Sequence, residues 1–295
     1  MILVFGATGH IGGELISILS SEGVPSVAVT RAPSRERPLP GIRWAKADLA
    51  EPASVDGLLR DVKTMFLLTG NGADLATLQV TAIRAAAKAG VEYVVKLSAL
   101  GASDRSKSPI GRAHYEAEQE LIASGMRWVI LRPHVFMQNL LDQLPAIVRE
   151  GRIFAASGDG KVPFIDTRDI AAVAAVTLTH SGHGGKKYVL TGPEALSYFD
   201  VARILTAVVD RPIAYGALSL EEARERMARA GDAPWAIEGL LALAAYQRAG
   251  GPTAVVHDTV QRVLGRPPRS LAEFAKDHAQ MFRGDDARRA TESFR

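Results

Sequence analysis

The sequence contains no cysteine among its 295 residues. This excludes disulfide bonds, thiolate metal sites and a cysteine nucleophile. Long hydrophobic runs are also missing, because no apolar stretch reaches the ~18–20 residues that a transmembrane helix requires. The apolar residues 2–5 lead directly into a glycine-rich turn, without the charged and apolar regions of a secretory signal. We therefore predict a cytoplasmic protein with no membrane partner.

An excess of charge of one sign is missing as well. Lys and Arg together number 35 against 32 Asp and Glu, which gives a net charge of only +3. A nucleic-acid-binding surface needs a concentrated basic stripe, so we expect no nucleic-acid partner. The His, Asp and Glu residues show no metal-ligand spacing such as H-E-x-x-H, and we expect no metal.

Short apolar strands alternate with helical segments through the first half of the chain. The sequence predicts strands at 2–5, 26–30, 42–45, 64–69, 93–98 and 127–131, and helices at 11–21, from Glu51-Pro52 onward, at 74–89 and at 111–124. Elements of this length in this order predict an α/β fold, a Rossmann-type doubly wound parallel sheet.

The strongest chemical signal is the glycine-rich loop between the first predicted strand and the first predicted helix. In this position Gly6 would permit the tight turn, Gly9 would let the backbone approach a pyrophosphate, and Gly12 would let the helix pack closely on the strand. Amide groups at the helix start would hold the phosphates. The alternative is a strand–helix turn without a ligand. The predicted cofactor loop comprises Gly6, Ala7, Thr8, Gly9, His10, Ile11 and Gly12.

The residue at the end of the second strand indicates which nucleotide binds. An NAD-binding protein usually has Asp or Glu there, about 20 residues past the glycine loop. Here the strand ends in Thr30-Arg31, with Arg35 and Arg37 close behind. A carboxylate would repel a 2′-phosphate, whereas a guanidinium can bind it with two hydrogen bonds. We therefore predict NADPH as the cofactor and Arg31 as a phosphate ligand, with Arg35 and Arg37 solvated.

The alternation becomes less regular beyond about residue 150. A helix at 169–178 and a strand at 187–190 are followed by residues 197–283, which read as mostly helical. We predict an NAD(P)-binding domain over 1–150, a smaller, mostly helical substrate lobe over 151–283 that is interleaved with it, and a flexible tail over 284–295.

Several segments resemble the NmrA-like, atypical short-chain dehydrogenase/reductase family: GATGHIGG, VVKLSALGA, the stretch 114–141 and FIDTRDIAA. The resemblance covers roughly the first two hundred residues. It implies NADPH-dependent reductases or dinucleotide-binding regulators. It also implies that Asp48 and Leu49 lie near the adenine, that Leu68, Thr69, Ser98 and Ala99 border the ribose and nicotinamide, and that Arg132, Pro133, His134 and Phe136 flank the nicotinamide and the substrate.

Catalytic residues are harder to assign, because the Tyr-x-x-x-Lys dyad of conventional short-chain dehydrogenases is absent. Tyr115 lies in the right element, but Gln119 stands where the lysine would be. Resemblance to the isoflavone-reductase-like branch places His114 at a general acid/base position, eleven residues before Gly125. The alternative is a histidine that caps the helix start or faces solvent. Lys96 lies inside an apolar strand and must be paired, for which we favour a structural salt bridge to a carboxylate over catalysis.

Our hypothesis is hydride transfer from NADPH to a small organic acceptor, either a quinone or an activated double bond, with His114 or Tyr115 assisting the proton. A quinone suits the missing dyad, because its oxygens are readily protonated after hydride transfer. The first alternative is an NADPH sensor that acts on a protein partner without turnover. The second is a sugar-nucleotide epimerase or dehydratase, which the missing dyad disfavours. A homodimer is compatible with each hypothesis.

Overall fold

The chain divides into two units in the computed structural model, which describes residues 1–284. Unit 1 comprises Met1–Pro133, Thr167–Leu190 and Arg262–Gly265. Unit 2 comprises His134–Asp166, Thr191–Gln261 and the described residues from Arg266 onward. The functional bounds at 1–150 and 151–283 stay predictions. Apart from Gly284, the predicted tail lies outside the described residues.

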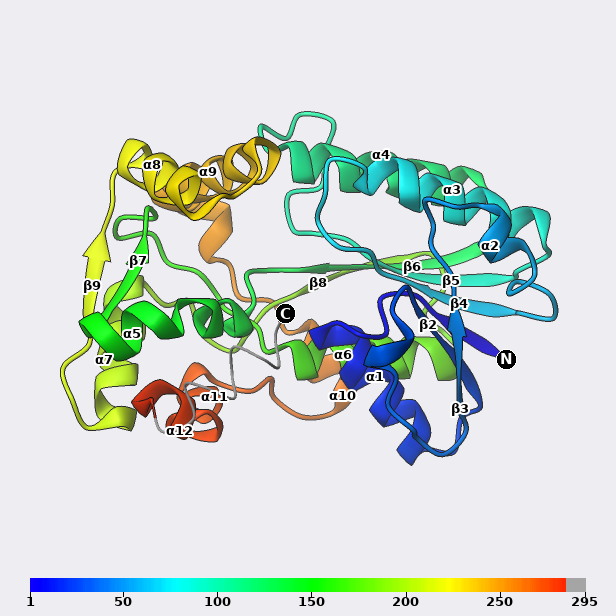
Figure 1. Ribbon diagram of the computed structural model, residues 1–295, viewed down its shortest axis with the longest axis horizontal. Helices are drawn as coiled ribbons and strands as arrows, with labels where there is room; N and C mark the ends of the chain where they lie inside the picture. Colours follow the sequence, from blue (N-terminus) through cyan, green and yellow to red (C-terminus); the bar gives the residue numbers. More distant parts are fainter. Residues whose placement is uncertain (285–295) are drawn as a thin grey trace. The chain divides into compact units, whose positions relative to one another are not determined.

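A parallel sheet of seven strands forms the centre of unit 1 (Figure 1). In spatial order these are β3 (Ile42–Lys46), β2 (Ser26–Thr30), β1 (Ile2–Val4), β4 (Thr64–Leu67), β5 (Tyr93–Leu97), β6 (Arg127–Pro133) and β8 (Lys186–Leu190). Every neighbouring pair is parallel, with Leu3 opposite both Val27 and Met65. The central strands are near-continuous apolar runs because helices cover both faces. The predicted α/β fold with a doubly wound parallel sheet is confirmed.

Helices cover both faces of this sheet (Figure 1). On one face α1 (His10–Ser21) packs against α6 (Thr167–Thr179), and on the other α3 (Leu75–Lys88) packs against α4 (Pro109–Ala123). The helix expected from Glu51-Pro52 is the short α2 (Ala53–Asp56), and η1 (Pro33–Arg35) is a single turn. On the face covered by α3 and α4, alternate strand residues and the inner faces of these two helices form a buried core, which includes Leu3, Val27, Met65, Ile83 and Leu121.

Unit 2 is mostly helical, as predicted. Its core joins Phe164, Leu205, Phe274 and Phe282. Reciprocal capping boxes begin α7, α8 and α11, each with Ser at the cap and Asp or Glu three residues later. The helices are η2 (Met137–Gln143), α5 (Leu144–Glu150), α7 (Tyr198–Val209), α8 (Leu220–Ala230), α9 (Pro234–Ala249), η3 (Gly251–Ala254), α11 (Leu271–Asp277) and α12 (Ala279–Arg283), with α10 (Thr259–Leu264) running from unit 2 into unit 1.

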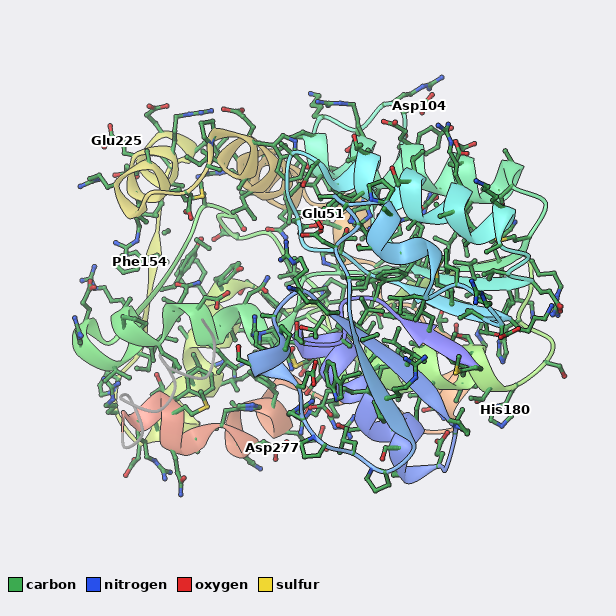
Figure 2. All side chains as sticks on the ribbon, turned by 45° about the vertical axis from the view of Figure 1, so that its right-hand side comes forward. Glu51, Asp104, Phe154, His180, Glu225 and Asp277 are labelled. Atoms are coloured by element: carbon green, nitrogen blue, oxygen red, sulfur yellow. The ribbon has the colours of Figure 1, made fainter. Side chains whose placement is uncertain are left out.

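Two strands of unit 2 were not predicted. β7 (Arg152–Ala155) and β9 (Ala214–Ala217) pair in parallel. Each has only four residues, and the AYGA segment has little intrinsic strand preference. The guanidinium of Arg226 lies 4.0 Å from the ring centre of Phe154, which Figure 2 labels on β7. Across residues 1–284, no helix combines the length and the apolar character that a bilayer crossing demands.

Candidate functional site

Two glycines of the predicted cofactor loop are required by close backbone packing. Gly6 has a φ of +73°, and a Cβ there would lie 2.8 Å from the Leu68 carbonyl oxygen. A Cβ on Gly12 would overlap the carbonyl oxygen of Gly6. Gly9 differs, because its Cβ would meet nothing closer than that same oxygen at 3.5 Å. No contact within the protein therefore requires a glycine at position 9. The glycine instead keeps the space above the loop free of a side chain.

The same loop opens α1 in a form suited to an anion. Gly9 is the N-cap, no side chain caps the helix, and its first turn has no acidic residue. The first N–H groups of a helix have no intrahelical acceptor, and the helix dipole favours negative charge there. Thr8 is half-buried, His10 exposed and Ile11 buried. The cradle therefore fits a diphosphate, which the amides of Ile11 and Gly12 would hold over the small Gly9.

Arginines follow β2 as the sequence indicated. Arg31 is exposed directly after the strand, and Arg35 is exposed in η1. Arg37 is exposed, as expected, and in addition its Nη2 donates to the Gly13 carbonyl at 3.1 Å. That contact brings a second guanidinium onto the first turn of α1. The positive charge beside the glycine loop therefore comes from more than Arg31.

The residues that follow β3 and β4 are held in place by hydrogen bonds and packing with neighbouring residues. The Asp48 carboxylate accepts from the Ala50 amide at 3.0 Å, and Leu49 is buried. Leu68 lies against Gly6. Thr69 Oγ1 accepts a hydrogen bond from the buried Gln79 Nε2 of α3 at 2.9 Å. The Thr69 hydroxyl proton is thus directed away from Gln79.

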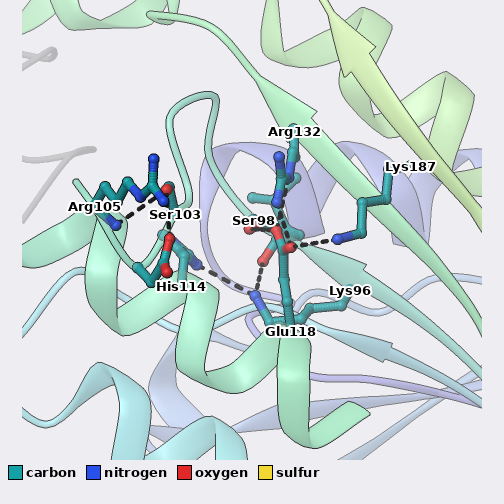
Figure 3. Close-up of polar contacts among 10 residues, drawn as sticks. Lys96, Ser98, Ser103, Arg105, His114, Glu118, Arg132 and Lys187 are labelled. Atoms are coloured by element: carbon teal, nitrogen blue, oxygen red, sulfur yellow. Dashed lines mark hydrogen bonds and ion pairs between the residues drawn. The ribbon is translucent and has the colours of Figure 1, made fainter. Parts of the chain in front are cut away.

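A buried carboxylate connects the residue after β5, the end of β6 and the start of β8 (Figure 3). Glu118 of α4 has no exposed surface and forms two hydrogen bonds with the Arg132 guanidinium. Ser98 Oγ donates to Glu118 Oε1 at 2.6 Å, and Lys187 Nζ lies 3.3 Å from Oε2. Burial raises the pKa of Glu118, but the hydrogen bonds from Arg132 and Ser98 outweigh it and lower the pKa below its usual value.

Sequence analysis missed Glu118, although its spacing carried a signal. It lies four residues after His114, so the two occupy one face of α4 together with buried Gly111 and Leu121. A charged residue on an otherwise buried helix face must be paired. The bond from Ser98 uses its hydroxyl proton, and the pair with Glu118 fixes one edge of the Arg132 guanidinium.

Lys96 and His114 contact each other beside this carboxylate (Figure 3). Lys96 is fully buried, and its Nζ lies 3.1 Å from the Leu97 carbonyl oxygen and 3.3 Å from His114 Nδ1. Within residues 1–284 no carboxylate lies at ion-pair distance from Nζ, so the expected salt bridge is not formed. Burial lowers the pKa of Lys96 to about 7, with the Glu118 charge opposing this and the Arg132 charge adding to it.

His114 lies within α4 and is 5% exposed, so it neither caps the helix start nor faces solvent. Burial, followed by the charges of Lys96 and Arg132, lowers its pKa well below the usual value, so the imidazole is neutral. Tyr115 is half-buried and points about 100° away around the helix.

The remaining predicted residues lie around the end of β6. Ala99 is half-buried, and buried Pro133 accepts from the Leu100 amide at 3.0 Å. His134 and Phe136 belong to unit 2. Both ring nitrogens of His134 are engaged, since Nδ1 accepts from Val135 N at 2.8 Å and Nε2 lies 3.0 Å from the Thr253 carbonyl. Burial lowers its pKa to about 4, so the imidazole is neutral.

A family model described as NAD(P)H-binding matches residues 6–181. The chain is 41% identical over 287 residues to NAD(P)H azoreductase of Xenophilus azovorans, covering 96% of this chain and 99% of the relative. It is 36% identical over 284 residues to (4-alkanoyl-5-oxo-2,5-dihydrofuran-3-yl)methyl phosphate reductase of Streptomyces griseus, covering 96% and 99%. A solved NADPH-dependent quinone oxidoreductase of Escherichia coli, complexed with NADPH, has a TM-score of 0.85, 29% identity, and coverage of 94% and 99%.

Proposed function

Because this chain belongs to the NAD(P)H-binding family, in its NmrA-like, atypical short-chain dehydrogenase/reductase group, we propose that it transfers hydride from NADPH to a quinone or an activated double bond. The family, the nicotinamide cofactor and the oxidoreductase class predicted from the sequence are confirmed. The relatives cited above carry reductase names, which favours turnover over a sensor role. The cytoplasmic location and the homodimer remain predictions.

The glycine cradle is the observation that supports nucleotide binding in this chain. Gly6 and Gly12 shape the loop, whereas Gly9 has a free face beside the uncapped start of α1. We assign the diphosphate to this loop and the 2′-phosphate to Arg31, with Arg37 adding positive charge nearby. The other predicted contacts stay proposals: Asp48 and Leu49 to the adenine end, Leu68, Thr69, Ser98 and Ala99 along the ribose and nicotinamide, and Arg132, Pro133, His134 and Phe136 beyond them.

Two observations support the proposed class of acceptor: the substrates in the names of the relatives, and the side chains of this chain that can donate a proton. The relatives include an azoreductase, a quinone oxidoreductase and a reductase of a 5-oxo-2,5-dihydrofuran. The substrate class in each of these names contains a reducible double bond. NADPH would supply the hydride when bound. The chain would orient the acceptor and hold a proton at His114, with Tyr115 as the second candidate.

The test is a spectrophotometric assay of nicotinamide absorbance with NADPH and NADH against a quinone, an enone and an azo dye. We expect consumption of NADPH with at least one acceptor and weaker activity with NADH. Gly12→Ala is the matched variant, because its methyl group would overlap the Gly6 carbonyl and distort the cradle. Gly57→Ala is the control, since a Cβ there meets nothing within 4 Å. Nucleotide binding without turnover of any acceptor would refute the enzyme and support the sensor.

A further inference from the structure

The chemistry of the two side chains decides which one donates the hydrogen bond between Lys96 and His114. A protonated lysine carries only donors, so Nδ1 of His114 must be the acceptor across the 3.3 Å that separate them. A neutral imidazole that accepts at Nδ1 carries its proton at Nε2. The Leu97 carbonyl oxygen, 3.1 Å from Nζ, holds the ammonium in place.

This arrangement resolves a chemical difficulty in the proposed role of His114. A neutral imidazole is a very weak acid, because loss of its Nε2 proton would leave an imidazolate. It can release that proton only if Nδ1 gains one in the same step. Lys96 Nζ is the group placed to supply it.

We propose that Lys96 is a positioning residue that fixes the Nε2–H tautomer of His114 and delivers a proton to Nδ1 as Nε2–H is given to the reduced acceptor. This inference rests on the proposed function. In the step, the N–H bond of Lys96 and the Nε2–H bond of His114 break, while an Nδ1–H bond and a bond from hydrogen to the acceptor form. The acceptor has gained hydride and a proton, Lys96 has become a neutral amine, and His114 has changed tautomer.

The proton is restored through the same path. Lys96 has no exposed surface, whereas His114 is 5% exposed. Water therefore reprotonates His114 at Nε2, and the Nδ1 proton returns to Lys96. The charge lost from Lys96 equals the positive charge that hydride transfer creates on the nicotinamide, so the step does not accumulate buried charge.

Burial and the charges packed around Lys96 together set how readily it loses its proton. α4 contributes His114 and the Glu118 carboxylate, β6 contributes Arg132, and β8 contributes Lys187, which reaches Glu118 at 3.3 Å. Two fixed cations thus surround one carboxylate. Burial makes the Lys96 ammonium less favourable than at the surface, the Glu118 charge opposes this and the Arg132 charge adds to it, and together they lower the pKa of Lys96 to about 7.

The direct test is long-range ¹H–¹⁵N NMR of ¹⁵N-histidine-labelled protein without nucleotide, from about pH 6 to about pH 8.5. His114→Gln identifies the signals of His114 among the seven histidines. We expect the Nε2–H tautomer at the acidic end and a change in both ring nitrogens with a midpoint near 7. Lys96→Met should abolish this change. Lys187→Met is the control, since it removes a nearby charge that does not touch His114, and should retain the change.

Any one of three results with wild-type protein would refute the proposal. These are an Nδ1–H tautomer of His114 at the acidic end, formation of the His114 imidazolium within the titrated pH range, and ¹⁵N chemical shifts of His114 that stay constant throughout. The same change in folded Lys96→Met would also exclude Lys96 as its origin.

Turnover provides a second, separate readout. Reduction of an enone depends more on protonation of the reduced acceptor than reduction of a quinone does. Lys96→Met should therefore lower kcat for an enone about tenfold more than it lowers kcat for a quinone. An unchanged ratio refutes the relay. If wild type reduces no acceptor, the proposed function fails, while the NMR titration still decides the tautomer.

Discussion

Neutralising the buried Glu118 carboxylate is the perturbation that tests the site's electrostatics most directly. Glu118→Gln keeps the side-chain volume and removes the charge. The side chain has no exposed surface, whereas those of Arg132 and Lys187 are 20% and 36% exposed. Breaking a buried ion pair costs ~3–5 kcal/mol, and partial solvation of the two cations places this case near ~3 kcal/mol.

The same helix offers a matched control. Glu120 also forms two hydrogen bonds with an arginine, Arg84, at 2.8 and 2.9 Å. That arginine side chain is 69% exposed. Exposed pairs contribute only ~0–1 kcal/mol. Glu120→Gln should therefore alter stability little, although the bond geometry is nearly the same.

Thermal unfolding followed by circular dichroism separates the two variants. We expect Glu118→Gln to lower Tm by about 5 °C and Glu120→Gln by no more than about 2 °C. Because the pKa of Glu118 is lowered on folding, its stabilising effect is present above the ordinary value of 4.5 and is lost as the pH falls further. The difference between wild type and Glu118→Gln should shrink accordingly in acid. Equal, small Tm changes in both variants would refute the argument from burial.

Three further predictions concern the cofactor loop and Lys96. Gly9→Ala should weaken NADPH binding about 10- to 100-fold in calorimetry without lowering Tm, because its methyl group fits the protein but displaces the diphosphate; unaltered affinity would contradict the cradle. Arg31→Glu should reverse the preference for NADPH over NADH, whereas Arg60→Glu, the same charge change elsewhere on unit 1, should not; an unchanged preference would remove Arg31 from the site. The free energy of unfolding, measured with urea, should rise between pH 7 and 10.5. In this range the folded chain has lost the Lys96 proton, whereas the unfolded chain still retains it. Lys96→Met should lack that rise, which is at most ~5 kcal/mol; identical pH profiles would show that Lys96 titrates normally.

The sequence by itself determined the sheet and the loop. The strand β1 is a continuous apolar run and β2 is mostly apolar, and the glycine spacing lies between a strand and a helix, so both signals are local in the chain. Gly6 is an example, because its positive φ is a requirement of the turn itself. The contacts of Arg37 and Gln79 were not predictable in this way, since each reaches a residue from another element.

Only the tertiary structure decided how the polar residues at the strand ends are paired. Glu118, Arg132 and Lys187 come from three elements and meet because α4 packs against β6, which pairs with β8. The strands β7 and β9 likewise form through pairing rather than through their own propensities. Lys96 was identifiable as a buried charge, but its contact with a histidine instead of a carboxylate depends on side-chain positions that a linear pattern does not encode.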